Sequence, residues 1–299
     1  MTSRLARDPP GHHRVNRPLT ISIVVGVFLL FFLIERVVSL RHPKARLLTR
    51  VLINLSISAL AFAAALVVVQ PVVARLLHWT SHGPFGLIPL AGLSGGVGFV
   101  FGFLLLDLSF YYWHVALHRI PLLWRFHNVH HIDPDLDVST GFRFHFGEVA
   151  LSSVFRTVQI GLIGPSLGTF AVYELVFHVN TIFHHSNVRL PVRLERLLNK
   201  LVVTPRMHGI HHSQVRDETD SNYGVVFPWW DRLHRTLRLN VPQADIIVGV
   251  PGYSKPSDNT LWHCLSLPFR AQRNYWRTPD GQLVRRDVEL SGVQTRLAE

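Results

Sequence analysis

Long apolar stretches separated by short polar segments dominate the first part of the chain. Residues 19–40 and 51–77 are almost entirely apolar, and residues 85–112 form a third apolar stretch that is rich in glycine. About 20 consecutive apolar residues are enough for a helix to cross the hydrocarbon core of a bilayer. The pattern therefore predicts three membrane-spanning helices before residue 113.

A fourth apolar stretch, residues 149–185, is interrupted around Pro165. Its length and the break within residues 161–168 predict a tight helical hairpin that enters and leaves the membrane on the same side. From Ser186 onward the chain is mixed and polar. The predicted fold class is all-α: a polytopic transmembrane bundle of about four spans, or three plus a helical hairpin, with a cytosolic helical cap.

Composition supports the membrane assignment. Of the 299 residues 48% are hydrophobic and only 16% are charged, against about 25% charged in a typical soluble protein. The net charge of +11 comes from arginines that flank the apolar segments, as expected beside membrane spans. This distribution argues against a nucleic-acid partner. The single cysteine, Cys264, excludes an intramolecular disulfide and a zinc ribbon.

Histidine is the unusual residue, with 19 copies against 19 acidic residues. Eight of them form three clusters at i, i+3 or i, i+4 spacing, which places the members of a cluster on one side of a helix. We call these clusters the three histidine boxes: His114 and His118; His127, His130 and His131; His208, His211 and His212.

Three boxes in one chain predict a metal site rather than surface polarity, which would explain any single pair. Imidazole suits iron, copper and zinc, and eight ligands are too many for one catalytic metal that keeps open positions. A membrane zinc hydrolase is the alternative, but it would need a glutamate base as in His-Glu-x-x-His. No box contains one. A metal transporter would place its ligands in the middle of a span, whereas the boxes lie at span ends.

The order of the boxes behind membrane spans resembles the fatty acid hydroxylase/sterol desaturase superfamily. Further similar segments are Trp124-Arg125-Phe126 before the second box, Phe183-His184-His185-Ser186-Asn187, and Asn222-Tyr223-Gly224 after the third. The resemblance covers roughly residues 95–240. It suggests four parts: a flexible basic tail at 1–18, an N-terminal transmembrane region at 19–94, a di-metal domain at 95–240 and a C-terminal polar tail at 241–299.

The resemblance implies a membrane di-iron oxygenase. Such an enzyme hydroxylates or desaturates a lipid, for example a sterol or a fatty acyl chain, using O2 and two electrons. The implied cofactors are two iron ions, which zinc can replace during purification. The implied partners are a lipid from the bilayer and a separate reductase or small electron-transfer protein. The boxes would face the cytoplasm, from a bacterial inner membrane or the endoplasmic reticulum.

The family's pattern also assigns residues. The eight box histidines and His185 are the expected metal ligands. Four other residues are candidates for a further ligand or for a group that orients one: His145, His184, Asp107 and Asn222.

Overall fold

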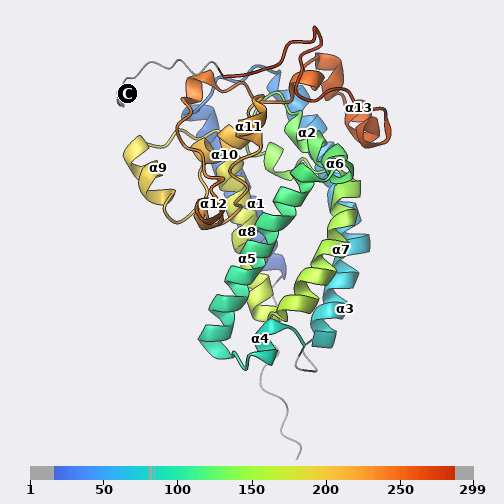
Figure 1. Cartoon of the computed structure of the whole chain (residues 1–299), viewed down its shortest axis with the longest axis vertical. Helices are drawn as coiled ribbons and strands as arrows, with labels where there is room; N and C mark the ends of the chain where they lie inside the picture. Colours follow the sequence, from blue (N-terminus) through green and yellow to red (C-terminus); the bar gives the residue numbers. More distant parts are fainter. Residues whose placement is uncertain (1–16, 81–82, 84, 287–299) are drawn as a thin grey trace, which may run out of the picture.

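Four long apolar helices set the shape of the molecule (Figure 1). In the computed structural model, which describes residues 17–80, 83 and 85–286, they are long and apolar enough to cross a membrane by length and composition. Their large apolar side chains point outward, as Leu33, Val67 and Val154 do with more than half of their surface exposed. Outward apolar faces suit contact with lipid, and these helices indicate an integral membrane protein. The four candidate spans are Pro18–Val37, Leu47–Thr80, Gly95–Arg119 and Phe146–Ile163.

The predicted helical bundle is confirmed. The helices of the bundle itself are α1 (Arg17–Val37), α2 (Leu47–Ala64), the π-helix η1 (Ala65–Val69), α3 (Gln70–Thr80), α4 (Leu87–Leu90), α5 (Gly95–Arg119), α7 (Phe146–Ile163) and α8 (Leu167–His185). No β-strand forms within the described ranges, only isolated bridges. Most of the predicted basic tail, residues 1–16, lies outside the described residues.

Shorter helices gather at the upper end of the bundle in Figure 1, opposite α4. They are α6 (Pro121–His131), η2 (Thr140–Phe142), α9 (Val192–Leu198), α10 (Pro205–His211), α11 (Arg216–Thr219), α12 (Trp229–His234), η3 (Gln243–Asp245), η4 (Pro251–Tyr253), η5 (Pro256–Asn259), α13 (Leu261–Ser266) and η6 (Leu267–Phe269).

The second span is one continuous rod that contains a π-helical turn. The rod runs through α2, η1 and α3, and Gln70 N–H donates to Ala65 O five residues back. Pro71 follows directly, and a proline ring clashes with the carbonyl four residues earlier in a regular α-helix. The wider π turn in front of Pro71 is a known way to absorb such a disruption.

The predicted hairpin corresponds to α7 and α8, joined through Gly164. It is not tight, because the two helices pack mainly on other helices rather than on each other. Gly164 ends α7 with a φ of 63°, a conformation that favours glycine. The Ser166 hydroxyl caps α8 by accepting from Thr169 N–H at 3.1 Å. The α7 helix packs against α2, η1 and α3, while α8 packs against α1, α5 and α10. The hairpin therefore ties the spans to the third histidine box.

The third span differs in extent from the predicted apolar stretch. Residues 87–90 form the separate helix α4, and a turn at Gly92 precedes α5, which begins at Gly95; both glycines have positive φ. The helix α5 then continues through the first box to Arg119. His114 and His118 therefore lie in the last turns of a membrane span. The apolar stretch alone, residues 85–112, ended before them.

The start of α2 belongs to the box-bearing end of the molecule. Its Arg50 side chain lies 2.9 Å from Asp133 Oδ2 and also donates to Asp137. Asn54, one turn later, donates to Asp133 and Ser139 at 2.9 Å each. All of these groups are buried, so this polar network fastens the second span to the loop after the second box.

The domain boundaries drawn from the sequence remain predictions. Residues 241–286 nonetheless fold back onto the box-bearing end, where Tyr253, Cys264 and Leu267 are buried beside Ile57 of α2 and Trp124 of α6.

Candidate metal centre

Four helices bring the boxes together. His114 and His118 lie near the end of α5, the second box ends α6, and the third box ends α10. Prolines occupy the first turns of α6 and α10, where their fixed φ and missing N–H suit a helix start. The local sequence thus begins two short helices so that each ends on its histidines, while His185 is the last residue of α8.

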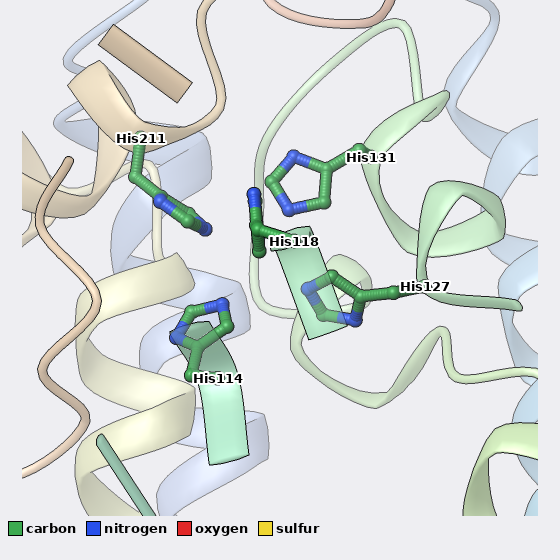
Figure 2. Close-up of side chains that lie close together, drawn as sticks. All are labelled: His114, His118, His127, His131 and His211. Carbon is green, nitrogen blue, oxygen red and sulfur yellow. The ribbon is translucent and has the colours of Figure 1, made fainter. Parts of the chain in front are cut away.

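Five histidines form the first group. Each has a ring nitrogen within 4.8 Å of one on every other member, and Figure 2 shows the five rings around a shared space, reached from α5, α6 and α10. The members are His114, His118, His127, His131 and His211.

Four histidines form the second group, which draws on α6, α8 and α10: His130, His185, His208 and His212. The Nε2 of His185 lies 3.1 Å from Nε2 of His130 and 3.0 Å from Nε2 of His208. The Nε2 atoms of His208 and His212 are 3.1 Å apart. All four side chains are buried. Four Nε2 atoms therefore converge on one place from three helices.

These arrangements fit metal ions better than hydrogen bonds among the rings. A neutral imidazole has one donor and one acceptor nitrogen, and His185 already has Nδ1 2.8 Å from the Thr181 carbonyl. Its Nε2 is then an acceptor that cannot donate to two neighbours. Ligand nitrogens about 2.1 Å from one metal and at right angles lie about 3.0 Å apart. The observed separations match that spacing.

Ring nitrogens without a hydrogen-bond partner also indicate a bound metal in the group of five. The Nε2 atoms of His127, His131 and His211 are buried without a hydrogen-bond partner. A buried polar atom left without a partner costs about 1–3 kcal/mol, so three in one small space call for a bound group. The donor set and the orphaned atoms both fit a metal.

The far nitrogens of several rings are held by the surrounding chain. His127 Nδ1 lies 3.0 Å from Glu148 Oε1. His114 Nδ1 lies 2.8 Å from the Tyr223 carbonyl, and His211 Nδ1 lies 2.7 Å from the Ser221 carbonyl. An Nδ1–H donated to an oxygen fixes the tautomer and leaves Nε2 free to bind metal. These contacts therefore aim lone pairs into the group of five.

Burial keeps the rings in the form that binds metal. It lowers the pKa of His211 to about 3, and it lowers the pKa of His130, His131, His208 and His212 well below 6.5. Neighbouring imidazoles lower these values further, since two charged rings would repel. Metal ligation requires neutral imidazole, so the site needs no deprotonation near neutral pH.

All nine histidines predicted as ligands fall in the two groups. The other candidates lie around them. His184 borders the group of four, with its ring centroid 4.2 Å from that of His208. His145 caps α7 by accepting from Gly147 N–H at 2.9 Å, and its Nε2 lies 3.1 Å from the Leu265 carbonyl. Neither ring belongs to a group.

Asp107 and Asn222 hold backbone in place. Asp107 accepts from Trp230 Nε1 at 2.8 Å and from Phe227 N–H at 3.1 Å, which fastens the 226–230 segment to α5. Asn222, with a φ of 55°, donates to the Met207 and Arg238 carbonyls at 2.9 and 2.8 Å. Asn222 stands between the two residues whose carbonyls meet His211 and His114, so it shapes the segment that orients both rings.

Asp107 was the one acidic residue that the sequence named as a candidate, and the sequence did not single out Glu148 or the two carbonyls. Glu148 lies in the first turn of α7, and its distance in sequence from His127 gave no sign of contact. A backbone carbonyl carries no side-chain signature, so Ser221 and Tyr223 could be found only through the fold.

The spans and the buried histidine groups define a class: a helical membrane protein with a centre able to hold metal ions. Residues 99–236 match the fatty acid hydroxylase family, and the three boxes and the His185 segment lie within this range. This segment, a little under half of the chain, is therefore similar to the fatty acid hydroxylase family.

Relatives extend the comparison. The chain is 29% identical over 153 residues to the ornithine lipid hydroxylase of Rhizobium tropici, covering 51% of this chain and 45% of that protein. It is 29% identical over 181 residues to human alkylglycerol monooxygenase, covering 59% and 38%. Human cholesterol 25-hydroxylase is 29% identical over 147 residues, covering 46% and 50%. The matches thus span half or less of these relatives. No solved structure matches the chain.

Proposed function

We propose that the chain is a membrane-bound, O2-dependent lipid hydroxylase that holds one iron ion in each histidine group. The observation that carries the proposal is the meeting of nine histidines, all with buried side chains, in two adjacent groups at one end of the spans. Imidazole donors suit iron as well as zinc. The relatives' names, all hydroxylases or monooxygenases, favour the insertion of oxygen over desaturation. Such chemistry needs a redox-active metal such as iron, because zinc has no redox chemistry.

A reduced iron pair would supply the dioxygen activation that protein side chains lack. The net reaction consumes one O2, two electrons and two protons for each C–H converted to C–OH, and it releases one water. The electrons come from a separate reductase or small electron-transfer protein.

The chain's own residues hold and shield this centre. The nine histidines bind, while Glu148 and the carbonyls of Ser221, Tyr223 and Thr181 set the direction of four rings. Buried Val129, Ile132 and Ile210 exclude water around the boxes. Exclusion of water strengthens each electrostatic contact there and limits side reactions.

The substrate class is a bilayer lipid. The relatives are named for an ornithine lipid, an alkylglycerol and cholesterol, which share only an apolar body that resides in a membrane. Because the first box lies near the end of a span, a chain or ring in the bilayer could reach the centre without entering water. We place this end at the cytoplasmic face of an inner or endoplasmic-reticulum membrane, where reduced electron carriers are available.

The test combines metal analysis with lipid chemistry on the full chain. The purified protein should contain two irons, and lipids of cells that express it should gain one oxygen atom derived from labelled O2. His130→Ala and His211→Ala, one in each group, should abolish the product, whereas His42→Ala, at an exposed position, should not. One zinc per chain with hydrolysis that needs no oxygen would instead support a metallohydrolase.

A further inference from the structure

A broad groove lies beside the third box, on the box-bearing end of the molecule. It encloses about 1050 Å³ and is bounded by residues 215–218, 238–245 and 274–286. Its lining contains five arginines, namely Arg216, Arg238, Arg277, Arg285 and Arg286. The acids are three: Asp217, Glu218 and Asp245. The proposed chemistry does not use this groove.

The groove carries a positive surplus on its exposed rim. Glu218 is neutralised within the wall, since Arg286 Nη2 lies 2.9 Å from its Oε2. Arg216, Arg277 and Arg285 are exposed, and so are Asp217 and Asp245. The surplus of arginines over acids along the whole groove is therefore two positive charges. Such a rim attracts an acidic partner over a distance of about a Debye length, roughly 8–10 Å at physiological salt.

A tryptophan connects this groove with the interior. Trp276 lines the groove, and the guanidinium of Arg216 lies 5.8 Å from the centre of its ring. On the inner side Trp276 stacks on Trp124 of α6, with ring centroids 5.9 Å apart and an interplanar angle of 23°. Trp124 is 5% exposed, so the pair joins the groove to the core.

The inner tryptophan touches the group of five histidines. Its ring centroid lies 4.8 Å from that of His118 and 5.2 Å from that of His131. Two aromatic rings in succession therefore separate the groove from the metal group. Electron tunnelling weakens steeply with distance, and contacting rings give a short coupled route through otherwise saturated packing.

We propose that this groove is the docking surface of an acidic one-electron carrier protein, and that Trp276 and Trp124 form the route by which its electrons reach the group of five. This inference rests on the proposed function, which needs two electrons per turnover. Two reduced carriers dock in succession, and each is oxidised by one electron. The tryptophans couple donor to acceptor and are themselves neither oxidised nor reduced.

The groove suits a protein carrier better than a small reductant. This preference rests on the exposed arginines, because complementary charge chiefly speeds association between macromolecules and selects the partner. Charge reversal on the rim should therefore act on carrier binding, while loss of the outer ring should act on electron transfer after binding.

The test uses the full chain in detergent with two reductants. One is a reduced plant-type ferredoxin, as an acidic carrier; the other is dithionite with methyl viologen, which needs no docking. The variants are the double change Arg277→Glu with Arg285→Glu, and separately Trp276→Leu. The control is Arg196→Glu, an exposed arginine of α9 outside the groove.

The rim double variant should raise KM for ferredoxin by about tenfold or more and reduce its dependence on salt. Trp276→Leu should lower kcat with ferredoxin and leave KM near the wild-type value. Turnover with methyl viologen and the iron content should match wild type in both variants, and Arg196→Glu should match throughout.

Equal ferredoxin kinetics in all variants would overturn the docking proposal, even with normal methyl viologen turnover. Unchanged ferredoxin kinetics with weakened binding to phosphatidylglycerol vesicles would reassign the groove to the membrane surface. Wild-type protein that turns over with neither reductant would instead refute the proposed function, and the docking proposal with it.

Discussion

At the scale of single residues, orientation of the rings matters as much as their number. Glu148 is the one carboxylate within hydrogen-bond distance of a box histidine among the described contacts, at 3.0 Å from His127 Nδ1. It reaches from α7 to α6 and ties the hairpin to the second box. Its charge also makes Nε2 of His127 a stronger donor to a metal.

Glu148→Ala should therefore weaken metal binding by about 10–100-fold, the usual cost of losing such a partner. Glu148→Gln, which keeps an acceptor but not the charge, should lose less. Competition with a chelator of known affinity measures the effect, and Asp280→Asn, at an exposed position, is the control. Equal affinities for wild type and Glu148→Ala would show that His127 does not depend on this carboxylate.

Another residue-scale feature lies in the third box. The guanidinium of Arg41 covers Gly209, where a Cβ would overlap it. Arg41 also donates to the Pro205 carbonyl at 3.2 Å and to Gln243. The glycine within the box thus leaves room for an arginine that holds the start of α10.

At the scale of elements, the turn of the hairpin is tightly specified. Gly164, with φ of 63°, packs on the backbone at Phe85 and Gly86. A Cβ there would overlap the Phe85 carbonyl oxygen. Three residues earlier, Gly161 lies within α7 and has open space around its Cβ position.

This contrast gives a matched pair of substitutions. Gly164→Ala should lower the free energy of unfolding by more than about 1 kcal/mol, because strain and overlap add. Gly161→Ala should cause no loss, and the helix preference of alanine is worth up to about 1 kcal/mol. Thermal unfolding in detergent measures both. Equal midpoints of thermal unfolding for the two variants would show that the turn does not require glycine at position 164.

The elements also show what sequence could anticipate. Helical spacing identified the box histidines, and apolar length with Pro165 identified the hairpin. The sequence could not show which histidines share a group. His130 belongs to the group of four, while His127 and His131, from the same box, belong to the group of five. That division depends on where α6, α8 and α10 cross, which no local pattern encodes. The packing of residues 241–286 likewise rests on irregularly spaced side chains such as Tyr253 and Leu267.

At the scale of the whole molecule, nine buried imidazoles make stability depend on metal and acid. An unfolded histidine titrates near pH 6.5, whereas burial lowers the pKa of His211 to about 3 and lowers those of four further box histidines. The unfolded chain therefore binds more protons between these values. This contribution to stability is complete above pH 6.5 and is lost as the pH falls toward 3.

Metal-free protein should accordingly lose thermal stability steadily as the pH is lowered from about 6.5 to about 4, because the unfolded chain takes up protons that the buried rings do not. Metal-loaded protein should hold its midpoint to lower pH, because protons must displace the metal. Thermal unfolding before and after chelation, over this pH range, measures the difference. A metal-free midpoint that does not change with pH would contradict the burial of neutral rings.

The two groups are built on shared supports. The α6 helix supplies members to both, and so does the third box, with His211 in one and His208 and His212 in the other. An ion in either group would order α6 and α10, which the other group also requires. The second ion would then bind with a smaller loss of conformational entropy. Loading would then be positively cooperative, and chains would tend to be either empty or full. Scarcity of metal would then reduce the number of filled molecules and leave few half-filled ones.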